Sequence, residues 1–411
     1  MVKAGALYLS IITAFVIAVI CASLIMIAAH FKSSYLKDKR MSKLYRNMDS
    51  AISLVLAEAG EDTVGIKRID LFDDQSDSVI IKNHHWGVFG LASIQCFTSV
   101  DTLTRSFLIG LATEHDGTAV YLSDEDRPLS VSGDTRITGN AAAPKSGIRK
   151  SYADGKPYSG EKTVYGAIMD SKRMLPGLTE KWITEIEDKL KANPKQYQLL
   201  KGGNQYASFL MPLKEYNASA TELLSDSLSG QIILYSDTLL HITSNAHLNN
   251  VVIFAKSIII DKGFSGNAQL FARDSIVIGS GSVFAYPSVI AVMSDQTKVQ
   301  SKITLGEEVK FDGIILTHEP QRSALQTMIS IGRGTIIKGE VYATGLIKLD
   351  KKVMISGKTS CNRFIMQTSS TMYENFLIDV TFNRKSRPKA YLTSGIFKGI
   401  KEDKKILRWQ N

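Results

Sequence analysis

Few residues in this chain have the types and spacing that acid–base chemistry requires. His318 and Glu319 are adjacent and precede Pro320, so an imidazole and a carboxyl group lie together beside an expected turn. The sequence contains no P-loop, no H-E-x-x-H, no G-x-S-x-G and no paired C-x-x-C. His318 and Glu319 are therefore the best acid–base candidates, but they are weak ones, and the sequence predicts no catalytic residue and a chain that is not an enzyme.

Metal binding is also disfavoured by residue spacing. His84 and His85 stand beside Trp86, but adjacent side chains point to opposite faces of a strand and no Cys or carboxylate follows at ligand spacing. We expect a surface turn there. Polysaccharide-cleaving β-helices need two or more carboxylates that converge on one face. The aspartates in the second half of this chain are instead spread along it: Asp261, Asp274, Asp295, Asp312 and Asp350. We predict neither a metal site nor a cofactor site.

The stretch from about residue 240 to 364 repeats itself. Apolar-x-apolar triplets followed by Gly or Asp begin at Ile258, Ile276, Ile303, Ile329 and Ile347, and Leu240 opens a weaker copy. The starts are 18, 18, 27, 26 and 18 residues apart, and the two longer units carry polar extra residues at 294–301 and 319–326. Asp261 and Asp350 hold the position that Gly fills in other copies, so turn formation explains them.

Each repeat also contains a second and a third apolar run. The second includes Phe311, Ile337 and Ile355, and the third begins at Ile314 or Val341. A unit of short alternating runs cannot bury its inward side chains alone and must stack on its own copies. The pattern predicts a mainly β fold, a three-faced parallel β-helix or solenoid, with Gly at corners that need positive φ. A β-sandwich with coincidental spacing is the alternative. An isolated His241 or His247 is weak support for a hexapeptide acyltransferase, because no strict six-residue register is present.

The net charge of +9 is concentrated at the C-terminal end, where residues 384–408 carry nine Lys or Arg against Glu402 and Asp403. Apolar residues in the same tail, such as Ile396, Phe397 and Trp409, predict that it packs on the body rather than binding nucleic acid. Cys21 lies in an apolar run. Cys96 and Cys361 remain as a pair whose disulfide the sequence does not decide.

The N-terminal region predicts one long helix. Residues 6–29 are 24 consecutive positions without a charge, long enough to span a bilayer. A cleavable signal would be shorter and would end in a small-x-small site. Apolar residues then recur at helical spacing: Met41, Leu44, Tyr45, Met48, Ala51, Ile52, Val55 and Leu56. Gly60 is placed to end the helix. We expect a spanning half followed by an amphipathic half whose apolar stripe lies on the body.

This N-terminus resembles that of type IV pilins and type II secretion pseudopilins over about residues 1–60. A short leader with Lys3 and Gly5 precedes an apolar spanning helix that continues as an amphipathic one. The resemblance implies cleavage after Gly5 and assembly through the helix. Ser10 stands where the family has a Glu that pairs with a neighbouring subunit's amino terminus. The solenoid resembles the core of bactofilins, which are polymer-forming scaffold proteins, so neither family accounts for the whole chain.

The remaining segments complete the expected organisation. Residues 61–117 form a β-rich connection, and 118–364 form the solenoid, whose first coil is at about 120–139. An insertion at about 143–228 leaves the stack, carrying a helix at 179–192 that could cap an open end. Residues 365–411 form the basic tail, in which 373–382 is a helix or a strand.

The sequence predicts a membrane-anchored structural protein of the bacterial cell envelope, pseudopilin-like or a minor filament component. Its partners would be lipid and proteins or further copies, but not nucleic acid. Six basic residues follow the span: Lys32, Lys37, Lys39, Arg40, Lys43 and Arg46. By the positive-inside rule, these charges favour a body in the cytoplasm. The pilin-like architecture favours a body on the outer side of the membrane, and we prefer this second topology. The alternatives are a membrane-tethered, carbohydrate-binding or carbohydrate-active β-helix and a cytoplasmic bactofilin-like scaffold.

Overall fold

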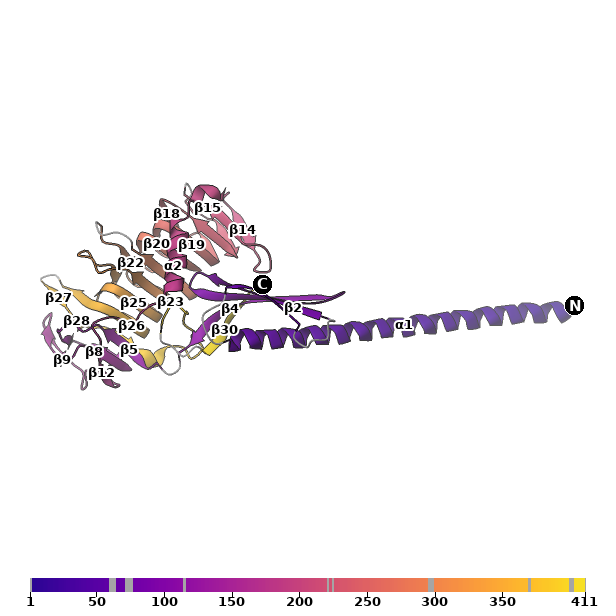
Figure 1. Cartoon of the computed structure of the whole chain (residues 1–411), viewed down its shortest axis with the longest axis horizontal. Helices are drawn as coiled ribbons and strands as arrows, with labels where there is room; N and C mark the ends of the chain where they lie inside the picture. The colour runs from indigo at the N-terminus through magenta and orange to yellow at the C-terminus, as the bar shows by residue number, and fades with distance from the viewer. Residues whose placement is uncertain are drawn as a thin grey trace. The chain divides into compact units, whose positions relative to one another are not determined.

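The computed structural model describes residues 2–58, 64–70, 77–113, 116–219, 222–223, 225–294, 299–368, 371–398 and 403–410. The chain divides into two compact units, which are described separately. Unit 1 comprises residues 1–58, 64–83 and 92–105, and unit 2 comprises residues 59–63, 84–91 and 106–411. The prediction of a mainly β chain with one long N-terminal apolar helix is confirmed (Figure 1).

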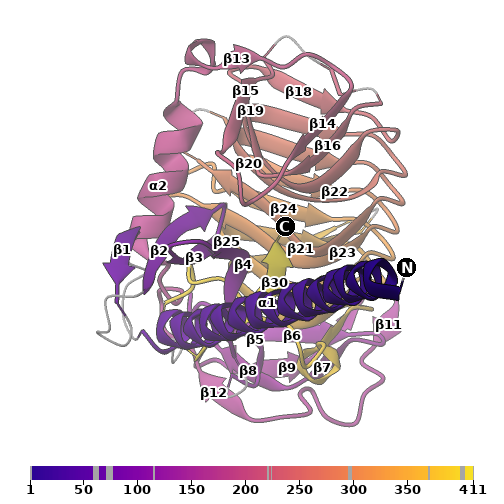
Figure 2. The ribbon, with the colours of Figure 1, turned by 90° about the vertical axis from the view of Figure 1, so that its right-hand side faces the viewer.

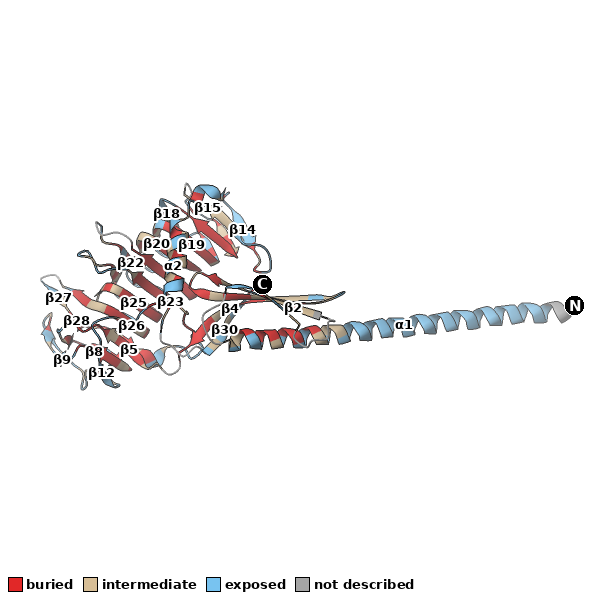
Figure 3. Cartoon of the chain, in the orientation of Figure 1, coloured by how far each residue is buried: buried red, intermediate tan, exposed pale blue. Residues whose placement is uncertain are grey.

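Unit 1 contains the helix α1, Val2–Ala57, which runs without a break over 56 residues. Residues 5–39 of this helix are exposed, as the pale blue ribbon in Figure 3 shows, and the helix is long and apolar enough to cross a membrane. The predicted continuous helix is confirmed. Gly60, where its end was expected, lies outside the described residues.

The second half of α1 carries the predicted buried stripe. Leu44, Met48, Ala51, Ile52 and Val55 are buried at three- and four-residue steps, whereas Tyr45 is exposed. Polar contacts tie this half to strands of the same unit: Arg40 Nε donates to Asp101 Oδ2 at 2.7 Å, and the Arg105 guanidinium lies 5.8 Å from the Tyr45 ring centre. Tyr45 therefore points outward because its ring packs under a cation rather than in the core.

A five-stranded sheet follows the helix in the order β1-β2-β3-β4-β30. Its strands are β1 (Gly65–Ile69), β2 (Asp77–Trp86), β3 (Phe89–Thr98), β4 (Thr102–Ala112) and β30 (Asp403–Gln410). β1 pairs antiparallel with β2, and β30 pairs antiparallel with β4. Gly87, at φ +62°, begins the two-residue turn between β2 and β3. The expected packing of the basic tail is confirmed by β30 and by the burial of Ile396.

Unit 2 is built around a closed sheet in which nearly all neighbouring strands are parallel (Figure 2). The predicted triplets lie in direct register in successive strands: Leu240, Ile258, Ile276, Ile303, Ile329, Ile347 and Phe364. All seven side chains are buried. The predicted repeat register is therefore confirmed, because each backbone ladder joins a residue to its counterpart one repeat later.

The second and third runs of each repeat pair in the same way. Phe311, Ile337 and Ile355 form one row, and Ile315, Val341 and Thr359 form another. The third run is shifted by one residue from the expected alignment, since Ile315 rather than Ile314 pairs with Val341. The strands of the closed sheet are β5 (Thr118–Leu122), β7 (Arg136–Thr138), β8 (Asn140–Ala143), β12 (Ile168–Asp170), β13 (Gln198–Leu199), β14 (Asn204–Ala207), β15 (Lys214–Asn217), β16 (Ser227–Gly230), β17 (Ile232–Tyr235), β18 (Leu239–Ile242), β19 (His247–Ile260), β20 (Ser265–Ile278), β21 (Val283–Met293), β22 (Lys302–Leu305), β23 (Lys310–His318), β24 (Met328–Ile331), β25 (Ile336–Leu349), β26 (Met354–Gln367), β27 (Met372–Glu374) and β29 (Thr381–Asn383).

The path of the chain differs from the expected insertion at 143–228. Val120 of β5 pairs with Thr359 of β26, β8 pairs with β5, and β12 pairs with β8, so residues 118–170 extend the stack beyond its C-terminal strands. Strands β13 and β15 extend it beyond β17 at the other end. A smaller sheet of β28 (Phe376–Ile378), β6 (Leu129–Ser132) and β9 (Ile148–Lys150) completes the first of these ends, and β10 (Tyr152–Ala153) pairs with β11 (Lys156–Pro157). Residues 373–382 are thus strands.

The helix α2, Glu180–Lys191, lies along the side of the stack and does not cap an end (Figure 2). Trp182, Ile186 and Leu190 are buried in a cluster with outward-facing Phe254 and Phe271 of the stack. The helix was predicted, but its position was wrong, because this apolar face of the sheet had to be covered. Short 3-10 helices occur at Pro194–Gln196 and Arg384–Ser386.

The corner glycines were correctly located, but positive φ explains only some of them. Gly279, Gly306 and Gly332 lack positive φ, and a Cβ at Gly306 would lie 2.6 Å from Ser280 N of the neighbouring coil. Gly339 has φ +144°, and its Cβ would lie 1.9 Å from the Gly313 carbonyl oxygen. Close approach of successive coils is therefore the main reason for glycine.

We predict that Gly339→Ala destabilises the protein much more than Gly263→Ala. Gly263 also has positive φ, +78°, but a Cβ there meets nothing within 4 Å. The control should lose about 1 kcal/mol from backbone strain alone, and Gly339→Ala about 3 kcal/mol or more because a clash is added. Urea unfolding measures both, and equal losses would contradict the close-approach explanation.

Candidate functional site

His318 and Glu319 stand where a strand of the stack ends. His318 is the last residue of β23, and Glu319 begins the polar loop 319–326 that was predicted as an extra segment. Thr317, Ala343 and Cys361 are paired across β23, β25 and β26, so the next residues along, His318, Thr344 and Asn362, form a polar row across three coils. The repeat thus places an imidazole, a hydroxyl and an amide side by side.

These residues line an open hollow of about 390 Å³. The floor is His318, Glu319, Tyr342, Thr344 and Asn362, and the walls come from the loop after β23 and from residues 173–178, the segment that leads to α2. The volume is within the range of about 300–1,000 Å³ that is usual for small-molecule sites. His318 and Glu319 were identified as candidates in the sequence, but the crossing segment that encloses them could not be found from their spacing.

Burial shifts both candidates toward their neutral forms. Burial lowers the pKa of the His318 imidazole, and it raises the pKa of the Glu319 carboxyl despite hydrogen bonds from Ser323 that act in the opposite direction. Ser323 Oγ donates to Glu319 Oε2 at 3.2 Å. Within the described residues, His318 Nδ1 and Glu319 Oε1 are buried and have no hydrogen-bond partner. A neutral imidazole and a neutral carboxyl can each exchange a hydrogen bond with a ligand.

A charge network lies next to the hollow. Glu125 contacts Arg322 at 2.6 Å and Arg363 at 2.7 Å, and Arg363 contacts Glu374 at 3.3 Å. Burial by itself would raise the pKa of Glu125, but the two guanidinium groups hold it below its usual range. Arg322 is therefore neutralised by the protein, and it also fixes the loop that forms one wall.

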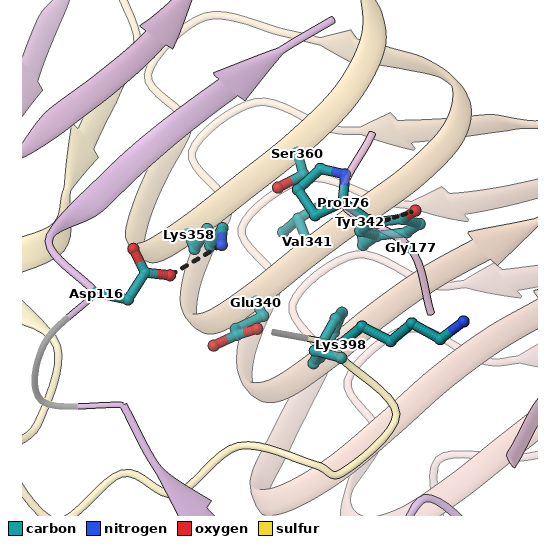
Figure 4. A pocket seen from close by; sticks show the side chains of 10 residues that line it. Asp116, Pro176, Gly177, Glu340, Val341, Tyr342, Lys358, Ser360 and Lys398 are labelled. Carbon is teal, nitrogen blue, oxygen red and sulfur yellow. Dashed lines mark hydrogen bonds and ion pairs between the residues drawn. The ribbon is translucent and has the colours of Figure 1, made fainter. Parts of the chain in front are cut away.

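A second pocket, of about 30 Å³, shares Tyr342 and Gly177 with the hollow (Figure 4). Asp116 and Lys358 face each other there at 2.8 Å, and Glu340 is the register partner of Lys358 in the adjacent coil. Glu340 also contacts Arg387 at 3.3 Å. A space of this size holds about one water molecule, so we interpret these charges as the attachment of the C-terminal segment rather than as a ligand site.

The aspartates of the repeat do not converge. Asp274 and Asp312 face Lys256 and Lys338 of neighbouring coils, at 4.0 and 3.4 Å. Asp261 and Asp350 hold the corner positions of Gly279 and Gly332, as predicted, and Asp295 lies outside the described residues. Groups of three or more His, Cys, Asp or Glu side chains able to hold a metal ion do not occur among the described residues.

The two histidines at 84 and 85 were wrongly predicted as a surface turn. Both lie in β2, and His85 is buried, with its ring stacked on Trp182 at 3.7 Å and its Nδ1 hydrogen-bonded to Glu185. The hydrogen bond and the charge of His85 hold the pKa of Glu185 below its usual range, although burial acts in the opposite direction. His85 therefore has a structural role in seating α2, and the missed signal was the outward aromatic surface that α2 covers.

Among the described residues, the other histidines and cysteines add no candidate site. His241 lies between Asp261, at 2.9 Å, and Glu222, and the hydrogen bond to Asp261 raises its pKa. His247 is exposed at the start of β19. Cys361 is a buried thiol outside any disulfide, and burial raises its pKa well above the usual range. The possible disulfide between Cys96 and Cys361, which the sequence left undecided, is therefore not formed.

The exposed half of α1 is the second candidate surface for function. Its apolar side chains include Phe15, Ile25 and Met26, which are 68%, 70% and 73% exposed. The predicted cleavage residue Gly5 is helical, and Ser10 Oγ donates to the Leu7 carbonyl oxygen at 2.8 Å. This surface is consistent with a single-pass membrane anchor.

The fold and these two surfaces define a class of protein: a mainly β chain with a parallel closed sheet and one N-terminal apolar helix. No family model and no curated protein matches the sequence. Among solved structures, the chain is similar to the competence-associated pilin ComZ from Thermus thermophilus, at 10% identity and a TM-score of 0.27, covering 85% of this chain and 86% of that chain. A TM-score this low does not show a common fold.

We predict that His318 makes stability fall as the pH decreases. Its folded-state pKa is lowered, so the unfolded chain binds the proton more readily, and the stabilising effect of the neutral ring is lost as the pH falls below about 6.5. His318→Gln, which cannot titrate, should lose less stability than the parent between pH 7.5 and pH 5. Urea midpoints measure this difference, and parallel pH profiles would contradict it.

Proposed function

We propose that this chain is a membrane-anchored assembly protein of the bacterial cell envelope, pseudopilin-like or a minor filament component. The observation that carries the proposal is α1, whose apolar residues 5–29 are exposed while a stripe of its second half, which includes Leu44, Met48 and Val55, is buried. Apolar surface in water costs about 25 cal/mol per Å². Lipid, and then helices of neighbouring subunits, are the environments that remove this cost.

We further propose that the closed parallel sheet is a three-faced solenoid that serves as a scaffold. In one coil, Ile329, Ile337 and Val341 each belong to a different row of register-matched residues. Three rows support a coil with three straight runs, one for each face of the solenoid. A stack of this kind offers a rigid surface of repeated side chains, as in the bactofilin cores that it resembles. The role is structural rather than catalytic, because the carboxylates of the repeat are paired with lysines or placed at corners.

The pseudopilin-like part of the proposal includes its partners and its topology. Processing after Gly5 would leave the helix as the assembly element, with Ser10 in place of an acidic residue. Ser10 already bonds to its own helix, so contact with a neighbour's amino terminus would be weaker than in family members with Glu. We place the body on the periplasmic or extracellular side, and the partners are lipid, other envelope proteins or further copies of the chain.

Ile17→Arg should lower the share of the protein in the membrane fraction, whereas Tyr35→Arg should leave that share unchanged. Ile17 is at the middle of the uncharged run, where an arginine costs about 2.5–3.5 kcal/mol, and Tyr35 is an exposed residue beyond that run. Fractionation in high-salt buffer, followed by immunoblotting, measures the difference. Equal membrane shares for the two variants would contradict a spanning helix centred near Ile17.

Protease treatment of intact spheroplasts tests the side of the membrane. If the body lies outside the cytoplasm, added protease should degrade it in intact spheroplasts, as exposed loops such as 319–326 are accessible to cleavage. A cytoplasmic protein probed in the same sample controls for lysis. Protection of the body until the membrane is lysed would favour the cytoplasmic bactofilin-like scaffold instead.

A further inference from the structure

We propose that the hollow bounded by β23, β25, β26, the loop after β23 and residues 173–178 is a binding site for a neutral saccharide. This site is independent of α1 and goes beyond the anchoring and scaffold role. It is defined by Glu319, His318, Thr344, Asn362 and the wall residue Met174. The ligand class follows from which polar groups of the site already have hydrogen-bond or ion-pair partners within the protein and which have none.

The main chain of the floor is already hydrogen-bonded. The His318 carbonyl oxygen accepts from Ser294 N–H at 2.8 Å, and Glu319 N–H donates to Thr344 Oγ1 at 2.9 Å. An extended peptide that adds to a sheet needs free main-chain groups, and these are engaged. Recognition at this floor therefore depends on side chains.

Two floor side chains hold buried polar atoms without a protein partner. Glu319 is 8% exposed, yet its Oε1 has no hydrogen-bond partner, and the same is true of His318 Nδ1. A buried acceptor left unpaired costs about 1–3 kcal/mol. Neighbouring hydroxyl groups, which both donate and accept, would satisfy a carboxyl and an imidazole together. A sugar ring carries several neighbouring hydroxyl groups of this kind.

The charges around the hollow favour an uncharged ligand. Arg322 contacts Glu125 at 2.6 Å and Arg173 contacts Asp126 at 2.9 Å, so both cations at the rim have carboxylate partners within the protein. Burial also favours the neutral forms of the two floor groups. The positive charge of each cation that lines the hollow is thus already balanced by a carboxylate, so the hollow offers an anionic ligand no excess positive charge.

One wall is apolar and accessible. Met174 is 81% exposed, and Leu175, Leu178 and Pro320 line the hollow beside it. Tyr342 fixes the wall, since its hydroxyl donates to the Pro176 carbonyl oxygen at 2.9 Å. The C–H face of a sugar ring can lie against such a wall while its hydroxyl groups face the floor.

Saturation-transfer NMR and calorimetry on the full-length chain test the proposal. The chain is held in lauryldimethylamine oxide micelles, because detergents with sugar headgroups would compete. The probes are maltotriose, cellotriose and tri-N-acetylchitotriose, with trigalacturonate as the anionic comparison. We expect at least one neutral trisaccharide to bind and trigalacturonate to bind at least tenfold more weakly.

Three variants localise the binding. Glu319→Ala should weaken the affinity at least tenfold, and Met174→Ala should weaken it several-fold without any folding defect, because that side chain is exposed. The matched control is Glu307→Ala, which removes an exposed carboxylate outside the hollow and should leave binding unchanged. The proposal is overturned if no neutral trisaccharide binds, if only trigalacturonate binds, or if neither Glu319→Ala nor Met174→Ala weakens binding.

Discussion

The parallel backbone ladder between successive coils is the constraint on which the rest of unit 2 depends. Because Ile276 must pair with Ile258 on one side and Ile303 on the other, every coil fixes the register of its neighbours. A shift of one residue would turn all inward side chains outward, so the hydrophobic pattern and the hydrogen bonds specify the same arrangement. The buried rows of Ile, Val and Phe are the result of this agreement.

The same constraint creates the sites between coils. Close approach leaves no space for a Cβ at Gly313 and Gly339, and it brings His318, Thr344 and Asn362 into one row although they are far apart in the repeat sequence. Residues that leave the stack, such as the loop after His318, then determine where a hollow forms. In a repeat fold, recognition surfaces arise where the regular pattern is interrupted.

The long helix in unit 1 follows from a different constraint. An α-helix satisfies its own backbone hydrogen bonds, so its first half can be stable in lipid without contact with the body. Its second half needs Leu44, Met48 and Val55 to be buried and therefore alternates apolar and charged faces. The change from uniform to one-sided apolarity near residue 40 marks where the surroundings of the helix change.

The sequence by itself determined the elements and the local register: the helix, the 18-residue repeat, the glycine corners and the adjacent His318 and Glu319. These follow from short-range periodicity, which the chain carries in its side chains. The tertiary structure alone decided that Val120 pairs with Thr359, that α2 covers outward aromatic residues, and that residues 173–178 enclose the hollow. Segments with the same alternation can pair with any coil, so their neighbours depend on which strand edges and apolar faces remain open in the folded chain.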